Sequence, residues 1–148
     1  MNVVKVPVKK LREEARLPAY GSEFAAGADL YACLDAEKEI LPGETLLVPT
    51  GVAVELPRGT VGLVFARSGL ATKKGLAPAN KVGVIDCDYR GEILVALYNQ
   101  SKEPQRILPG ERVAQLAVMP YLPALFEETD ALSGTVRGEG GFGSTGRQ

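Results

Sequence analysis

A short acidic stretch in the second half of the chain carries the groups most suited to chemistry. Asp86 and Asp88 are possible proton acceptors, and Tyr89 and Arg90 follow them directly. The chain contains no histidine, which removes His-based acid–base catalysis, Ser-His and Cys-His nucleophile pairs, and most zinc sites. Any catalysis must therefore use Asp, Glu, Tyr, Lys or Arg, with a hard, oxygen-seeking cation if a metal takes part. A plain binding protein is equally compatible with this composition.

Two earlier segments place charge beside flexible backbone. Asp29 lies at the edge of an apolar strand, where a carboxylate can order the water shell of a cation. An Asp at a strand start is, however, more often a turn former. Arg67, Ser68 and Gly69 would offer a guanidinium, a hydroxyl and free N–H groups to a phosphate. The alternative for this second segment is a capped helix with an exposed arginine.

Two later segments complete the set. Gln115 interrupts an otherwise apolar strand, and a buried amide needs a hydrogen-bond partner, which could also lie in the core. The tail from Ser133 to Gln148 is rich in glycine, so we expect it to be flexible unless a ligand or a partner holds it. Its Arg137 and Phe142 could bind an anion and cover an aromatic ring, whereas a frayed terminus is the simpler alternative. The tail lacks the lysine of a Walker A loop.

The elements that position these residues are mainly β-strands. Apolar residues recur at every second position in five runs, and turns of the Leu-Pro-Gly-Glu or Leu-Pro-Arg-Gly type separate several of them. The alternating sets are Val4, Val6 and Val8; Val52, Val54 and Leu56; Val61, Leu63 and Phe65; Ile93, Val95 and Leu97; and Ala114, Leu116 and Val118.

Helical signal is limited to a turn over residues 10–16 and a short helix over 68–74 that Ser68 would cap. A strand over 82–85, a turn over 86–91 and a return strand over 92–98 predict a hairpin. Because no crossover helix is present, the pattern disfavours doubly wound α/β folds. It predicts an all-β, jelly-roll-like β-barrel or sandwich with one short helix and a flexible C-terminal tail.

Bulk properties narrow the class of protein. The 148 residues fit a single domain over 1–148, since one core can be buried at that size. The net charge of −1 gives no global field to attract nucleic acid or an anionic membrane. No apolar run approaches the roughly 20 residues that cross a bilayer. Cys33 and Cys87 form no CxxC pair, so we expect reduced thiols in the cytoplasm.

In order and spacing, these five segments resemble the five motifs of the trimeric dUTPase family. The likeness runs from about Ala26 to the C-terminus, and its most specific parts are the stretches GVIDCDYRG and RGEGGFGSTG. One departure concerns the second motif, in which many relatives have proline where this chain has Ala66. Proline would stiffen the backbone directly before Arg67, so the change affects the rigidity of this segment and no catalytic group.

The resemblance implies a jelly-roll-like subunit that forms a homotrimer with three shared active sites. Each site would draw its first, second and fourth motifs from one chain and its third motif from a neighbour. The tail, residues 133–148, would close as a lid from the remaining chain. The implied reaction is the Mg²⁺-dependent hydrolysis of dUTP to dUMP and pyrophosphate, which keeps uracil out of DNA and supplies dUMP for thymidylate synthesis.

The resemblance also implies a role for each site residue. Asp86 would be the general base for the attacking water, and Tyr89 would stack beneath the deoxyribose and leave no room for a 2′-hydroxyl. Asp29 would orient the waters on Mg²⁺, which the triphosphate itself mainly binds. The other implied residues read uracil (Asn80, Val84, Ile85 and Leu94), hold phosphates (Arg67, Ser68, Gly69 and Gln115), or belong to the tail (Arg137 at the distal phosphates, Phe142 over the uracil, Ser144 and Thr145 over the phosphate chain, and Gly143 between them).

Two alternatives have distinct signatures. A dCTP deaminase, or a bifunctional deaminase–dUTPase of the same superfamily, would carry an acidic residue on the return strand, where residues 93–97 are apolar. A non-catalytic nucleotide-binding regulator would have no need of an intact Asp86, Arg137 and Phe142. Ammonia release from dCTP and pyrophosphate release from dUTP separate these alternatives from a dUTPase.

Overall fold

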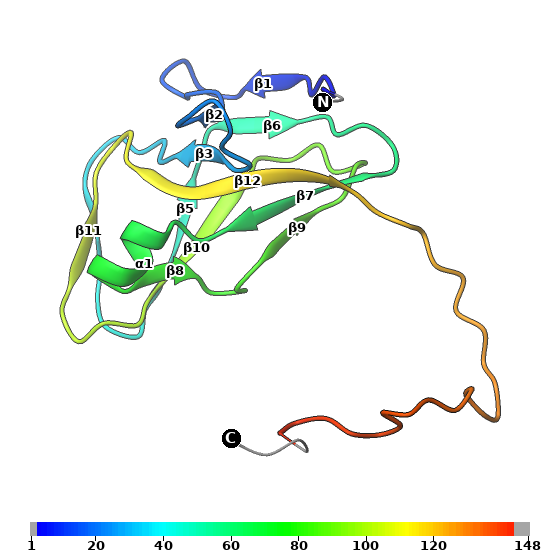
Figure 1. Cartoon of the computed structure of the whole chain (residues 1–148). Helices are drawn as coiled ribbons and strands as arrows, with labels where there is room; N and C mark the ends of the chain where they lie inside the picture. Colours follow the sequence, from blue (N-terminus) through cyan, green and yellow to red (C-terminus); the bar gives the residue numbers. More distant parts are fainter. Residues whose placement is uncertain (1–2, 144–148) are drawn as a thin grey trace.

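The computed structural model describes residues 3–143, which form strands and one short helix (Figure 1). This confirms the predicted all-β, jelly-roll-like class with a single helix of seven residues. No helix within residues 3–143 is long and apolar enough to cross a membrane. In chain order the elements are β1 (Val8–Lys10), β2 (Ala19–Tyr20), β3 (Ala28–Tyr31), β4 (Lys38–Ile40), β5 (Thr45–Pro49), β6 (Val52–Val54), β7 (Thr60–Phe65), α1 (Ser68–Lys74), β8 (Leu76–Pro78), β9 (Gly83–Ile85), β10 (Leu94–Asn99), β11 (Gln105–Ile107) and β12 (Arg112–Pro120).

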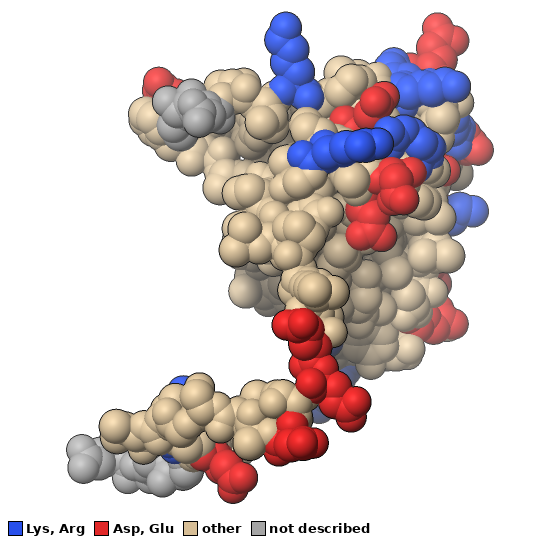
Figure 2. All heavy atoms as spheres, turned by 90° about the vertical axis from the view of Figure 1, so that its right-hand side faces the viewer, with Lys and Arg blue, Asp and Glu red and all other residues tan. Residues whose placement is uncertain are grey.

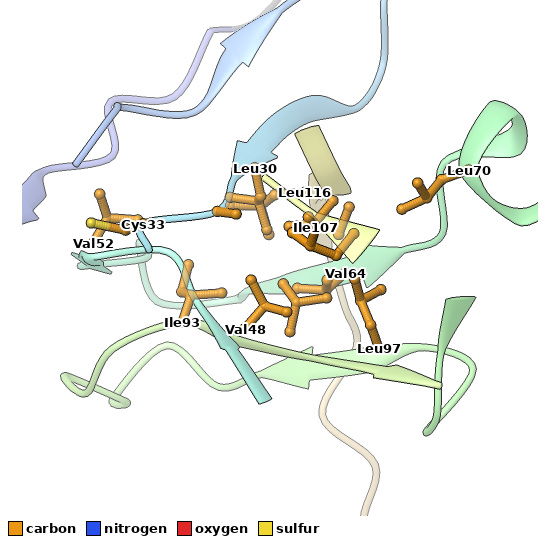
Figure 3. Close-up of a cluster of buried hydrophobic side chains, with 14 of the residues drawn as sticks. Leu30, Cys33, Val48, Val52, Val64, Leu70, Ile93, Leu97, Ile107 and Leu116 are labelled. Carbon is orange, nitrogen blue, oxygen red and sulfur yellow. The ribbon is translucent and has the colours of Figure 1, made fainter. Parts of the chain in front are cut away.

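The strands form two principal antiparallel sheets with the core between them. A five-stranded sheet has the order β2-β3-β12-β7-β9, and a three-stranded sheet has the order β5-β10-β8. The pairs β1-β6 and β11-β4 lie beside these sheets. Leu30, Val64 and Leu116 of the first sheet pack in one buried cluster with Val48 and Leu97 of the second (Figure 3).

Burial confirms most of the predicted alternation. The sets beginning at Val52 and Ile93 are buried throughout. On β7 the residues 61, 63 and 65 do share a face, but this face is only half-buried, and Val64 on the opposite face lies in the core. The first set does not form one strand, because β1 begins only at Val8.

The predicted hairpin is wrong in its pairing. β9 pairs with β7 in the five-stranded sheet, whereas β10 pairs with β5 and β8 in the three-stranded sheet. The turn over residues 86–91 therefore carries the chain from one sheet to the other and does not close a ladder. Alternation specifies the strands but not their partners, since pairing is decided by contacts distant in sequence.

The helix occupies the predicted residues, but its predicted cap is wrong. Arg67 is the N-cap residue and its side chain makes no capping hydrogen bond, while Ser68 is already the first helical residue. Gly75 ends the helix in the left-handed conformation, with a φ of 66°, as is common at helix C-termini. The predicted turn near residue 12 is confirmed by the bond from Ala15 N–H to the Arg12 carbonyl.

After β12 the chain leaves the body of the molecule. Residues 121–143, which we call the C-terminal strap, extend away from the sheets in Figure 1, and Figure 2 shows acidic side chains gathered along them. The N–H of Tyr121 still donates to the Gly59 carbonyl at 3.1 Å. Beyond it, the apolar side chains of the strap are 86% exposed or more at Leu122, Leu125, Phe126, Leu132, Val136 and Phe142. The predicted flexibility of this segment stays a prediction.

The turn between β5 and β6 supplies a test of packing. Gly51 has a φ of 70°, and an added β-carbon would lie 2.7 Å from the Ala15 β-carbon and 2.8 Å from the Cys33 Sγ. We expect Gly51→Ala to lower the free energy of unfolding by roughly 2–5 kcal/mol, from backbone strain plus overpacking. Gly43→Ala is the matched control, because Gly43 has a φ of 80° with nothing near its would-be β-carbon. It should cost only about 1–2 kcal/mol in urea unfolding, and equal losses would contradict the packing argument.

Candidate active site

A cavity of about 240 Å³ lies where β9 and β10 part into separate sheets. Residues of both strands line it together with Asn80, Asp86 and Tyr89. The structure thus brings together the residues predicted to contact a nucleoside, namely Asn80, Val84, Ile85, Asp86, Tyr89 and Leu94. We call this cavity the slot; Ile93 and Val95, both buried, also line it.

The main chain of this slot has free hydrogen-bonding edges. β9 pairs with β7 along one edge only, and β8 covers β10 only from Leu97 onward. Within residues 3–143, no strand pairs with the second edge of β9. Leu94 pairs with β5 on one side, and no described strand pairs with it on the other side. Buried N–H and C=O groups without partners are costly, so the slot suits a planar ligand with its own donors and acceptors.

The two carboxylates of the turn have different surroundings. Asp86 lines the slot beside Tyr89, whereas Asp88 lines a neighbouring groove together with Arg58 and Arg90. Alternation alone could not separate Asp86 from Asp88, and both line a third cavity, but of the two only Asp86 also lines the slot. Glu92 also lines the slot, but its carboxylate already accepts from the Gly51 N–H at 2.7 Å. Asp86 is therefore the carboxylate that could take a proton from a water molecule next to a ligand held there.

A second polar cavity, of about 380 Å³, lies at the far end of the five-stranded sheet. Asp29 of β3 is 8% exposed. Its carboxylate accepts from the Arg67 Nε at 2.8 Å and from the Arg112 Nη1 at 3.3 Å. Two guanidinium groups against one carboxylate leave a net positive charge, which favours an anion such as a phosphate. We call this group, with Ser68, Gly69 and Gln115, the anion cradle.

The partner of Gln115 is the main chain of Ala66, next to Arg67 of the anion cradle, and not a group in the core. Its Nε2 donates to the Ala66 carbonyl at 2.8 Å. Gly27 lies against the same side chain, since an added β-carbon would be 3.0 Å from the Gln115 Cδ and closer still to its Oε1. Gly27 therefore allows the Gln115 amide to approach the backbone of the cradle, a role that the sequence analysis missed.

Sequence reasoning also missed Arg112. Residues three apart on a regular strand face opposite sides of a sheet, so Arg112 and Gln115 should point apart. The register of β12 against β3 shifts between Arg112 and Ala114. Such a bulge re-aims a side chain, and here both residues line the same cavity. The only signal in the sequence was that Arg112 lies three residues before Gln115, in the fourth of the five segments.

Metal binding by protein side chains alone has little support here. No cluster of three Asp, Glu, Cys or His side chains that could hold a metal occurs in the described part of the chain. The anion cradle contains one carboxylate, Asp29, and two arginines already contact it. This donor set fits a cation that takes most of its ligands from a bound polyphosphate and water.

Asp86 and Arg67, which line different cavities of one chain, lie far apart. The register of β9 on β7 places Asp86 beside Val61, whereas Arg67 follows the opposite end of β7. Six residues of strand span about 20 Å. The strap residues join neither cavity of their own chain: Arg137 donates to the Gly140 carbonyl, and Phe142 and Gly143 are exposed. Ser144 and Thr145 lie outside the described residues.

Comparison with known proteins gives a single family. The model of a family described as dUTPase matches residues 13–146. Deoxyuridine 5'-triphosphate nucleotidohydrolase of Desulfitobacterium hafniense (strain DSM 10664 / DCB-2) is 53% identical over 99% of each chain. The enzyme of the same name from Thiobacillus denitrificans is 47% identical over 98% of this chain and 99% of its own.

Solved structures agree with this result. The Staphylococcus bacteriophage 80alpha dUTPase with dUPNHPP superposes with a TM-score of 0.88 at 29% identity, covering 98% of this chain and all of the other. A mutant dUTPase of phage phi11 of S. aureus, described as revealing the coordination of a structural Mg(II) ion, gives a TM-score of 0.77 at 25% identity. The latter match covers 86% of this chain and 98% of the phage chain.

The anion cradle can be tested with inorganic tripolyphosphate. We expect Arg112→Ala to weaken its binding roughly tenfold to 100-fold, the usual worth of hydrogen bonds to a charged group. Arg106→Ala is the matched control, since Arg106 pairs with Glu37 and Glu39 outside the cradle. Isothermal titration calorimetry at fixed ionic strength measures both. Equal losses in the two variants would show that only overall charge, and not the cradle, attracts the anion.

Proposed function

The chain belongs to the dUTPase family and hydrolyses dUTP to dUMP, and we propose that Asp86 is the general base of this reaction. The observation that carries the proposal is the slot between β9 and β10, which Asp86 and Tyr89 border. Asp86 would accept a proton from a water molecule whose oxygen bonds to the α-phosphorus. The bond from that phosphorus to the bridging oxygen breaks, and pyrophosphate leaves.

The free main-chain edges of the slot support uracil as the ligand. The backbone around Val84, Ile85 and Leu94 would bond the base, with the Asn80 side chain beside it. Cytosine reverses one donor and one acceptor, so it would leave buried groups unpaired, and such a mismatch is strongly rejected. Tyr89 would lie beneath the deoxyribose. Uracil specificity would thus come mainly from the backbone.

The anion cradle supports the triphosphate. Arg67, Ser68, Gly69 and Gln115 would hold the phosphates and neutralise charge that develops as pyrophosphate departs. Asp29 would orient water around a Mg²⁺ ion that the triphosphate mainly binds. When present, that ion would supply further charge neutralisation. Little covalent chemistry is required of the protein, so the absence of histidine from the sequence is no obstacle.

We infer further that three copies share each active site. The separation of about 20 Å between Asp86 and Arg67, argued from the register of β9 on β7, supports a site whose slot and cradle come from different chains. The exposed apolar residues of the strap support a third contribution, because such side chains are normally covered by a partner. Arg137, Phe142, Gly143, Ser144 and Thr145 would then close over a neighbour's site.

The rival activities have less support. Ile93, just before β10, and Val95 and Leu97 of β10 are all buried and apolar, where a deaminase would need an acid. Asp86 borders the slot, which a regulator without catalysis would not require. The single domain over 1–148, the cytoplasmic location and the lack of nucleic-acid or membrane partners stay predictions from composition and cysteine content.

Substitution of the two turn carboxylates tests the general base. Asp86→Asn keeps shape but removes basicity, so single-turnover hydrolysis of dUTP should slow by roughly 10²–10⁴-fold. Binding of a non-hydrolysable dUTP analogue should change little or tighten, because one negative charge near the triphosphate is lost. Asp88→Asn is the matched control and should be much milder. An inactive Asp88→Asn beside an active Asp86→Asn would overturn the assignment and leave the substrate unchanged.

Truncation tests the strap. A chain that ends at Ser133 lacks Arg137 and Phe142, so it should still assemble but hydrolyse dUTP very poorly. Sedimentation equilibrium measures the mass of both chains, and pyrophosphate release measures turnover. A trimer of normal mass with near-normal turnover would contradict the lid, while a monomeric full-length chain would contradict the shared site.

A further inference from the structure

We propose that Gly91 is a specificity-determining residue, because its missing side chain provides the seat on which the Tyr89 ring rests. This inference deepens the proposed function, in which Tyr89 selects deoxyribose over ribose. Gly91 itself touches no substrate in this scheme and acts by positioning Tyr89.

The contact between the two residues is unusually close. A β-carbon added at Gly91 would lie 2.5 Å from the Tyr89 Cζ, 2.9 Å from its Cε2 and closer still to its hydroxyl oxygen. All three atoms belong to the outer end of the ring. Tyr89 therefore packs directly on the α-carbon of Gly91, and its side chain, at 45% exposed overall, borders the slot.

Backbone conformation does not explain the glycine. Gly91 is not among the residues with positive φ, so its backbone is open to any L-residue. Gly143 and Gly51, in contrast, lie in the left-handed region. The three atoms nearest to a β-carbon at position 91 all belong to the Tyr89 ring and its hydroxyl, so this ring is the first group that the β-carbon would meet.

The chain directly after Gly91 is anchored to neighbouring backbone. The Tyr89 hydroxyl donates to the Glu92 carbonyl at 2.9 Å, and the Glu92 carboxylate accepts from the Gly51 N–H at 2.7 Å. The next residue, Ile93, donates from its N–H to the Val52 carbonyl at 2.9 Å. Residues 92 and 93 are therefore fixed to the turn between β5 and β6, so a side chain at 91 would displace the ring and not the strand.

Displacement of the ring has a defined chemical consequence. A tyrosine that excludes a 2′-hydroxyl by shape must lie within contact distance of the sugar, and a shift of about 1 Å is enough to change such a fit. Gly91→Ala should therefore reduce the preference for dUTP over UTP while Asp86, the slot backbone and the anion cradle stay intact. The kcat/KM for UTP should rise while the kcat/KM for dUTP falls. General destabilisation of the protein would not raise the value for UTP.

A double-mutant cycle on the full-length chain tests the inference. We would measure kcat/KM for dUTP and UTP in wild type, Gly91→Ala, Tyr89→Ala and the double variant. Gly91→Ala should lower the dUTP/UTP ratio by roughly tenfold to 10²-fold. Adding it to Tyr89→Ala should leave the ratio of that variant unchanged, because the ring that it displaces is gone. Val52→Ala, which weakens packing of the same region without touching Tyr89, should lower the melting temperature and keep the wild-type ratio.

The outcomes separate the inference from the function on which it rests. A wild-type ratio in Gly91→Ala, with a reduced ratio in Tyr89→Ala, overturns the seat alone. An unchanged ratio in Tyr89→Ala overturns sugar selection by Tyr89 and the seat with it, and absent dUTP turnover in wild type overturns the proposed function. If Gly91→Ala does not fold, the melting temperatures of Tyr89→Ala and of the double variant test the inference. Equal melting temperatures support the contact between Gly91 and the ring. A lower melting temperature in the double variant refutes it.

Discussion

The arrangement of this molecule depends on one topological constraint, the parting of β9 and β10 into different sheets. Had the two strands paired, their N–H and C=O groups would have satisfied one another and closed the space between them. Because β9 bonds to β7 and β10 begins against β5, their facing edges keep their hydrogen-bonding capacity for a ligand. A wall of main chain recognises a pattern of donors and acceptors with no flexible side chain to order. In the proposed site, base selection would therefore be a property of the topology more than of any one residue.

At the polar end of the five-stranded sheet, ion pairs to Asp29 position the arginines of the anion cradle. Asp29 holds Arg67 and Arg112 in place, so the two guanidinium groups lose little freedom when an anion arrives. The bulge in β12 brings Arg112 to the same side as Gln115. A salt bridge of this kind adds little to folding by itself when partly exposed. Its value lies in orientation, since a fixed arginine contributes more to stabilising a developing charge than a mobile one.

Local sequence predicted what is encoded locally. The class of fold, the helix over 68–74 and the buried sets on β6 and β10 follow from periodicity and turn chemistry. The partner of β9 could not be predicted, because a turn sequence states where the chain reverses and not which sheet receives it. Arg112 was missed for a related reason: a bulge breaks the period of two on which the analysis relied. Alternation places Asp86 and Asp88 on the same side of the strand, so it could not choose between them. The proposal of Asp86 needed the three-dimensional position of each carboxylate.

The division of the proposed site among copies follows from the size of the fold. In this sandwich of short strands, Asp86 and Arg67 lie about 20 Å apart, and the strap of the same chain reaches neither of the cavities that they line. Phosphate transfer to water benefits from a site closed to bulk solvent, yet a single small sheet pair leaves both cavities open. In the proposed trimer, closed rotational symmetry would solve this problem, because each copy would contribute a slot, a cradle and a strap and would receive the complementary parts from its neighbours. The exposed apolar side chains of the strap are then a feature of the assembly and not a defect of the monomer, and the same chain length encloses a nucleotide that one copy could only partly cover.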